Sequence, residues 1–347
     1  MRKRTKRMLS VLMAALMVVS IMPVTGSNNI VAKASTASAE SSVVTWSAAD
    51  ILAAQEGDSG LVLCGSGWAN NNATDDKTFE DGFSALGDNA KAGSTKAQTD
   101  GKTAAGTDYY YTYGNTLFIV LDTNNYNCAT HENVMRKAIK ENPNAKWKVV
   151  MFHQDIYGSA EHSNEPEITN LRYQLTPIFE QNDIDAVLTG HDHAYSRSKM
   201  LLGGTKANDY TDNEFDAELE KDMDAGENPT TKTVAPGNIK NDSTDEKDQK
   251  YLTYLKSIMD EKAIETVKKQ GSSVINPEGV LYMTAGSSSG SKYYDLVPRQ
   301  QTYIAHRWQE DVPTYSVVDV TENSLTINTY RTDNDEKIDE TFSITKS

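Results

Sequence analysis

Apolar residues along this chain fall into short continuous runs, separated by segments in which they recur at helical spacing. The continuous runs predict buried strands at 117–121, 147–152 and 185–189. Between them, helical spacing of apolar residues predicts helices over 131–140 and 167–181. Because strands and helices alternate along the chain, we expect an α/β fold with parallel strands covered by helices.

Further elements are predicted on either side of this core. Tyrosines at 109–113, followed by Gly114-Asn115, predict a hairpin that ends in the buried strand 117–121. Residues 251–269 have apolar side chains at helical spacing before Gly271, which predicts an amphipathic helix. Short strands are expected at 61–64, 280–284, 315–320, 325–330 and 341–344.

The polar segments define the expected domain organisation. Residues 1–34 combine a basic start, an apolar stretch and Ala32-Lys33-Ala34, which predicts a cleaved secretory signal peptide, with an uncleaved anchor as the alternative. Residues 35–108 are mostly small and polar and predict an irregular segment. Residues 109–347 form the expected folded domain. An acidic, solvated insertion without apolar periodicity interrupts it at 201–250.

Charge and cysteine content narrow the functional classes. The formal net charge is −15, and the predicted signal segment has six basic and no acidic residues, so the remaining chain is more acidic still. Such a chain repels nucleic-acid phosphates, and we expect no stable nucleic-acid partner. The two cysteines, Cys64 and Cys128, could pair in an oxidising compartment or stay free.

Histidines follow two of the predicted strands. His153 comes directly after 147–152, and His191 and His193 come just after 185–189. The carboxyl ends of neighbouring parallel strands meet at one edge of a sheet. Neutral imidazole is also a common ligand for borderline divalent cations. The spacing therefore favours a metal site.

The string Gly190-His191-Asp192-His193-Ala194-Tyr195 resembles the last metal motif, Gly-His-x-His, of the calcineurin-like metallophosphoesterases, and most closely their purple-acid-phosphatase branch. The stretch 147–153 resembles the penultimate metal motif, and 279–286 resembles the closing segment. The resemblance implies an α/β fold of two sheets packed face to face and flanked by helices. It also implies metal-dependent hydrolysis of a phosphate monoester or diester.

The same resemblance implies the roles of individual residues. His153, His191 and His193 would bind a divalent metal ion such as Zn, Mn or Fe, with His153 and His191 at one metal position and His193 at the other. His162 would contact the substrate phosphate or protonate the leaving group; without the resemblance, it would be read as a surface loop residue.

The upstream half of the family's ligand set is missing from this sequence. Two-metal hydrolysis needs a carboxylate that bridges cations about 3.5–4 Å apart. The first of the six histidines is His131, so the upstream motifs Asp-x-His and Gly-Asn-His are absent. His131 itself is predicted to be a surface residue at the start of a helix. Asp58 and Asp88 are weak candidates for a replacement bridging ligand.

Two functional hypotheses follow. The first is a secreted phosphoesterase of reduced activity that binds one metal ion and shows no stable membrane insertion after signal cleavage. The second is an inactive, degenerate relative that serves as a binding module or is a truncated product. In either case the fold would be incomplete in its N-terminal half, as in a family member with an internal deletion.

Overall fold

The computed structural model describes residues 107–123, 126–204, 206–223, 237–259, 262–265, 269–288, 290 and 292–347, together with the backbone of three earlier strands. These strands are β1 (Met17–Ile21), β2 (Gly60–Cys64) and β3 (Ala90–Lys96). Strand β2 agrees with the predicted strand 61–64. Strand β1 pairs with β2 and lies within the predicted signal segment. The rest of that segment, and Asp58 and Asp88, lie outside the described residues.

Within the described part of the chain, the larger sheet has eight strands around a parallel centre. Neighbouring strands β5, β6, β7 and β13 run parallel, and the outer pairs are antiparallel. Across the sheet the order is β14 (Ile304–Trp308), β8 (Tyr195–Ser198), β13 (Leu281–Ala285), β7 (Ala186–Thr189), β6 (Trp147–Met151), β5 (Thr116–Val120), β4 (Thr107–Tyr113) and β3.

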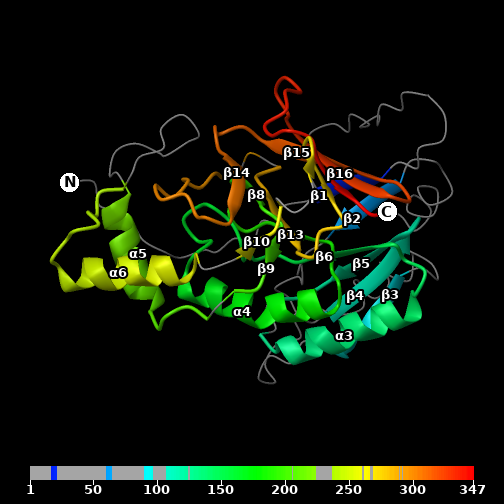
Figure 1. The fold of residues 1–347 in the computed structure, drawn as a ribbon, viewed down its shortest axis with the longest axis horizontal. Coiled ribbons are helices and arrows are strands. Elements are labelled where there is room, and N and C mark those ends of the chain that lie inside the picture. The colour runs from blue at the N-terminus through cyan, green and yellow to red at the C-terminus, as the bar shows by residue number, and fades with distance from the viewer. Residues whose placement is uncertain are drawn as a thin grey trace, which may run out of the picture.

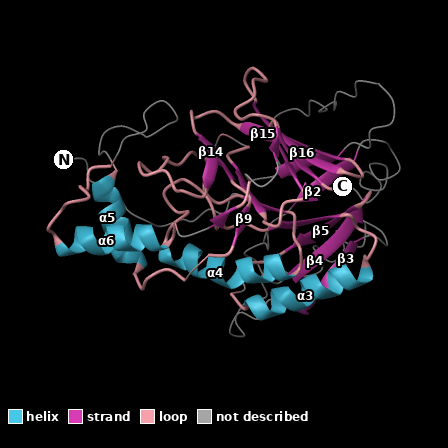
Figure 2. Ribbon diagram, viewed as in Figure 1, coloured by secondary structure: helices cyan, strands magenta, loops and turns pink. Residues whose placement is uncertain are grey.

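Two helices connect the parallel strands. Helix α3 (Cys128–Glu141) links β5 to β6, and α4 (Pro166–Gln181) links β6 to β7. Both helices lie along the same side of the large sheet in Figures 1 and 2, opposite β15 and β16. The alternating strands and helices predicted from the apolar pattern are therefore confirmed.

The second sheet covers the other face of the large sheet. In the described residues it has five strands, in the order β11 (Lys269–Gln270), β12 (Ser273–Ile275), β17 (Phe342–Thr345), β16 (Ser324–Arg331) and β15 (Thr314–Val320). Strands β15 and β16 alternate buried and partly exposed residues, because only one of their faces meets the core. A short ribbon of β9 (Leu201–Leu202) and β10 (Lys262–Ala263) completes the strands.

Side chains of the central strands alternate between two apolar cores. In β5, Phe118 and Val120 join the core between the sheets, whereas Leu117 and Ile119 join the core beneath the helices. All five residues of β5 are buried. A strand covered on both faces needs apolar residues throughout, which explains the continuous runs in the sequence. The two-sheet α/β class expected from the sequence is thus present.

The expectation for residues 201–250 is wrong in part. Helix α5 (Asp212–Asp222) forms inside this segment and packs with α6 (Glu246–Ser257) around a small core that includes Phe215, which is fully buried. Thr211 caps α5 by accepting a hydrogen bond from the Glu214 amide. The few apolar residues of α5 therefore make a real core, although they are too sparse to give a clear helical period.

The predicted helix 251–269 is misplaced. Helix α6 begins at Glu246 and ends at Ser257. Asp245 caps its start by accepting hydrogen bonds from the amides of Lys247 and Asp248. Gly271, expected just after the helix, instead has φ +63° in the tight turn between β11 and β12. Both helix end and hairpin turn favour glycine at positive φ, so the sequence signal was read as the wrong motif.

Candidate functional site

Backbone hydrogen bonds place His153 and His191 beside each other at the carboxyl ends of β6 and β7. The Phe152 amide donates to the Leu188 carbonyl at 3.3 Å, and the Gly190 amide donates to the His153 carbonyl at 3.0 Å. The backbone segments that follow β6 and β7 therefore stay paired beyond the last residues of the two strands. This is the meeting of strand ends that the sequence predicts.

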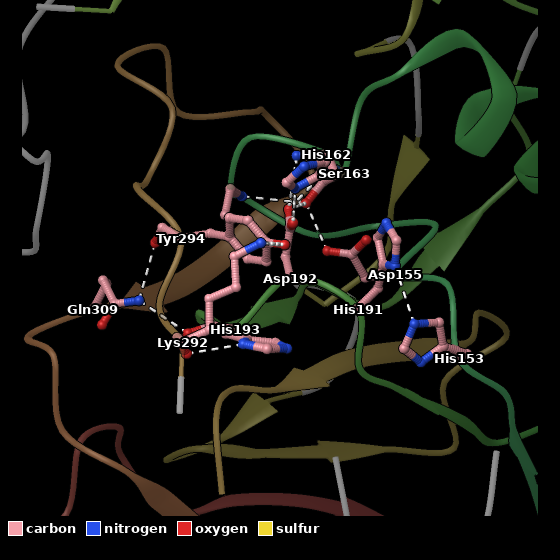
Figure 3. A network of polar contacts seen from close by, with 11 residues as sticks. His153, Asp155, His162, Ser163, His191, Asp192, His193, Lys292, Tyr294 and Gln309 are labelled. Atoms are coloured by element: carbon pink, nitrogen blue, oxygen red, sulfur yellow. Dashed lines mark hydrogen bonds and ion pairs between the residues drawn. The ribbon is translucent and has the colours of Figure 1, made fainter. Parts of the chain in front are cut away.

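The imidazoles of His153 and His191 face each other directly. His191 Nδ1 lies 3.1 Å from His153 Nε2, and the rings are nearly perpendicular (Figure 3). Burial, and then the charges of His191 and His193, lower the pKa of His153 to about 4. Burial also lowers the pKa of His191. Both rings are therefore neutral at pH 7, the form that binds a metal.

His191 also occupies an uncommon backbone conformation. Its φ is +71°, a region that residues other than glycine seldom adopt, although asparagine, aspartate and histidine do so more often than the rest. Such strain persists only where the surrounding structure enforces it, and it concentrates at functional sites. Here the chain changes direction just after β7, and the His191 ring contacts that of His153.

His193 is not part of this histidine pair. Its Nδ1 lies 2.8 Å from the carbonyl oxygen of Lys292, and its ring lies against Tyr294 at 5.2 Å between centroids. The described residues contain no group of three histidine, cysteine or acidic side chains arranged to hold one metal ion. Of the three predicted ligands, the structure brings two into direct contact, and the third contacts the Lys292 carbonyl and the Tyr294 ring instead.

His162 is held by Asp192 on the other side of His191. His162 Nδ1 lies 2.8 Å from Asp192 Oδ1, and the amides of His162 and Ser163 donate to Asp192 Oδ2 at 3.1 and 3.0 Å. Burial alone would lower the pKa of His162, but the hydrogen bond and charge of Asp192 raise it to about 9. His162 is therefore an imidazolium at neutral pH and donates to Asp192. Its ring is 5.5 Å from that of His191.

A second buried carboxyl, Asp155, completes the polar network. The Ser163 hydroxyl lies 2.6 Å from Asp155 Oδ2 and 2.7 Å from Asp192 Oδ2. One hydroxyl hydrogen cannot serve both carboxyls. Burial and the charge of Asp192 raise the pKa of Asp155 well above its usual range, which favours a proton on Asp155 in this network. A Cβ on Gly158 would lie 1.9 Å from Asp155, so this loop requires glycine there.

Arg172 supports the loop that carries these groups. It is fully buried in α4 and donates to the carbonyls of Ile156 and Ser163 and to the side chain of Asn164. It also donates to the carbonyl of Ile258, just after α6. The loop 153–164 is thereby tied to both neighbouring helices, which fixes His162 relative to His153.

Several residues of the site carried no clear signal in the sequence. Tyr294 lies 4.3 Å from His162 between ring centroids, and Gln309 donates its amide to the carbonyls of His193 and Tyr294 at 2.9 and 3.0 Å (Figure 3). The contacts of Tyr294 with His162 and of Gln309 with His193 join positions more than a hundred residues apart. Asp192 and Ser163 could have been suspected, because Asp192 lies between the two motif histidines and Ser163 follows His162.

The prediction that His131 lies at the surface is wrong. It is completely buried on the inner side of α3, and its Nδ1 lies 2.6 Å from Asp108 Oδ2 at the start of β4. Asp108 also accepts from the amide of Asp122 at 2.8 Å. The helix does begin near His131, as expected, but the residue falls on the same face as Val134 and Met135. Cys128, on the same helix, is buried and free, and the side chain of Cys64 lies outside the described residues.

Comparisons with known proteins agree with these motifs. A family model described as calcineurin-like phosphoesterase matches residues 64–195, starting within the segment predicted to be irregular. The chain is 43% identical to purple acid phosphatase 4 of Arabidopsis thaliana over 49 residues, 14% of each chain. It is 37% identical to an uncharacterized protein of Mycobacterium tuberculosis over 57 residues, 16% of this chain and 11% of the relative.

Among solved structures, a purple acid phosphatase from yellow lupin (Lupinus luteus) seeds aligns with 71% of this chain and 34% of its own, at 12% identity and a TM-score of 0.41. The alignments with the curated relatives thus span only a small share of their lengths. The family model nevertheless includes the predicted metal motifs at 147–153 and 190–195. Residues 64–195 therefore match the calcineurin-like phosphoesterase family, and short stretches of the chain resemble purple acid phosphatases.

Proposed function

We propose that this protein is a secreted, metal-dependent phosphoesterase that hydrolyses phosphate monoesters or diesters. The observation that carries the proposal is the neutral His153–His191 pair, placed beside an imidazolium, His162. The first group can hold a cation, and the second can act on an anionic substrate. Calcineurin-like phosphoesterases use divalent metals, which fits this division.

The facing imidazoles fit one transition-metal ion. Two nitrogens bound to the same zinc at about 2.0–2.1 Å lie roughly 3–3.4 Å apart, and the separation of the His153 and His191 nitrogens is 3.1 Å. Zn, Mn and Fe are the candidate ions, and a bound ion would polarise the phosphoryl oxygens. Asp192 accepts from His162 and Ser163 and therefore does not bridge. The described residues contain no group of three histidine, cysteine or acidic side chains that could hold a second ion.

His162 has the protonation state required of a general acid. Its proton is held in place by Asp192, and the neighbouring backbone amides fix Asp192 in turn. In the proposed reaction His162 contacts the substrate phosphate or donates its proton to the departing oxygen. An acid with a pKa near 9 stays charged at neutral pH, so it also stabilises negative charge that develops there.

A second candidate is a catalytically inactive relative that keeps only a binding role. The described residues contain no group of three side chains arranged to hold one metal ion, which favours this alternative. Metal content and turnover distinguish the two candidates.

We expect about one transition-metal ion per chain and low but measurable hydrolysis of an aryl phosphate after Zn, Mn or Fe is added. His191→Ala should lose the metal and at least about 100-fold in turnover, because one imidazole cannot retain the ion. His306→Gln is the matched control, since His306 contacts the Ile338 carbonyl outside the cluster. Metal-loaded wild type without turnover would favour the inactive alternative. Two tightly held ions would contradict the single-ion site.

The partners and location belong to the same proposal. The substrate is a phosphoester, and the acidic net charge disfavours nucleic acid as a stable partner. None of the described helices is long and apolar enough to cross a membrane. We propose that the signal at residues 1–34 directs export and is removed near Ser35. Sequencing the N-terminus of secreted protein tests this, and secreted protein that retains the basic residues 2–7 would contradict it.

A further inference from the structure

Lys292 brings a positive charge to the histidine cluster. Its ammonium lies 4.0 Å from the centroid of the Tyr294 ring and contacts the Tyr294 hydroxyl. The same Tyr294 ring also contacts the site, because its centroid lies 4.3 Å from that of the His162 ring. Figure 3 shows the Lys292 side chain extended along Tyr294 on the side of His162 and Asp192. The ammonium is thus one aromatic ring away from the proposed general acid.

The arginines near the site are buried away from solvent. Among the described residues around the loop 153–164, Arg172 is fully buried and donates to main-chain and side-chain oxygens. Arg307 is also buried, beneath the same loop, where it donates to the Val297 carbonyl at 2.7 Å. Lys292, by contrast, is exposed. Its charge is free to meet an anion that arrives from solvent.

The segment 292–297 is held firmly against the histidine loop. The Val297 amide donates to the Ser159 carbonyl at 3.0 Å, and Ala160 forms a bridge with Leu296. Gln309 fixes the carbonyl of Tyr294 to that of His193 through one amide group. A lysine on such a segment starts from a fixed position, so less conformational freedom is lost when it binds an anion.

We propose that Lys292 binds the phosphate group of the substrate, with Tyr294 holding its ammonium in place. This inference rests on the proposed phosphoesterase function and adds a phosphate-binding residue to it. A phosphate ester carries up to two negative charges, and the described site offers only the imidazolium of His162 and this ammonium to match them. Lys292 acts as a point charge with several donors, which suits phosphate oxygens.

The test compares Lys292→Met with Lys292→Arg and with Lys256→Met, an exposed lysine at the end of α6, in metal-loaded protein. For each variant we would measure kcat and KM for an aryl phosphate. The inhibition constant of inorganic phosphate and its Kd by calorimetry complete the measurements. Lys292→Met should raise KM, the inhibition constant and Kd about tenfold, with kcat changed less. Lys292→Arg should recover most of the loss, and Lys256→Met should match wild type.

The outcomes separate this inference from the proposed function. Unchanged KM and phosphate affinity in Lys292→Met, with wild-type turnover intact, overturns the role of Lys292 alone. Wild type that binds phosphate through Lys292 but shows no turnover supports the inference and contradicts the phosphoesterase function. Wild type that does not bind phosphate overturns the inference. Because Lys292 is exposed, thermal unfolding of each variant should match wild type.

Discussion

At the scale of single residues, neighbouring histidines in the site differ in their protonation. Burial keeps His153 and His191 neutral, whereas Asp192 keeps His162 charged although it is partly buried too. One carboxylate therefore decides which imidazole serves as acid and which ones remain free to bind a cation. Separation of pKa values between adjacent groups is how a site assigns chemical roles.

Gly158→Ala should destabilise the protein by about 1–3 kcal/mol, as overpacking of a filled site does. The added methyl would lie 1.9 Å from Asp155 Oδ2 and 2.2 Å from Ser163 Oγ. Chemical denaturation measures the effect. Gly114→Asn is the control, because nothing lies within 4 Å of its Cβ and asparagine tolerates its φ of +56°. A loss below about 0.5 kcal/mol for Gly158→Ala would show that the loop can yield.

Cys128 should react slowly with an alkylating reagent in the folded protein. Burial, with the charge of Asp108, raises the pKa of its thiol to about 11. A raised pKa means less thiolate at a given pH, so the rate should increase about tenfold per pH unit up to that value. The experiment uses Cys64→Ser protein, in which Cys128 is the remaining cysteine. Equal rates in folded and urea-unfolded protein at pH 8 would contradict the burial of this thiol.

At the scale of elements, buried polar contacts connect α3 and α4 to other parts of the fold in addition to apolar packing. Helix α3 is joined to β4 through His131 and Asp108, and α4 is joined to the site loop through Arg172. These contacts cross elements that follow one another closely in the chain. Each fixes the position of a helix along its axis, which apolar packing alone leaves less defined.

Breaking the Asp108–His131 contact should cost about 3–5 kcal/mol of unfolding free energy, the range for removing one partner of a buried pair. Asp108→Asn, His131→Ala and the double variant form a cycle measured by chemical denaturation. The exposed pair Arg136–Glu132 on the same helix is the control and should contribute about 0.3–0.5 kcal/mol. Strictly additive effects of the two buried substitutions would show that the residues do not interact.

At the scale of the whole molecule, two apolar cores unite the sheets and α3 and α4, while α5 and α6 have a separate small core. Figure 1 shows α5 and α6 at one end of the molecule, away from β15 and β16. Tyr254 links the small core to the site by donating to the Asn164 carbonyl at 2.8 Å. Because the core of α5 and α6 is separate from the two larger cores and contains fewer buried residues, it should open before the sheets separate.

Limited proteolysis should cut wild type first within 201–250, where the sequence has little apolar periodicity. Phe215→Ala should bring earlier cuts in α5, because it removes a fully buried ring from the small core. Strands β6 and β7 should resist under the same conditions, since both their faces are covered. First cuts inside either strand would contradict the domain organisation. Mass spectrometry of the fragments identifies the sites.

The apolar pattern predicted the parallel centre of the fold well, because strands covered on both faces must be apolar throughout. It missed β8 and β14, whose sequences are mixed. Buried Arg197 of β8 is neutralised by Asp339, 142 residues away, and no local pattern reveals such a partner. The motif histidines were found, and the meeting of His153 with His191 followed from their strands. The orientation of His193 depends on Lys292, which lies in a distant loop.

The hydrogen bond between the Gly190 amide and the His153 carbonyl has a thermodynamic consequence. Side chains that must be ordered when a ligand arrives lose rotational entropy, and that loss weakens binding. Here folding has already fixed the main chain at both positions and brought the two imidazoles into contact, so less entropy is left to lose. The affinity of the His153–His191 pair for a cation should therefore exceed that of the same two side chains on a flexible peptide, although the number of ligands is equal.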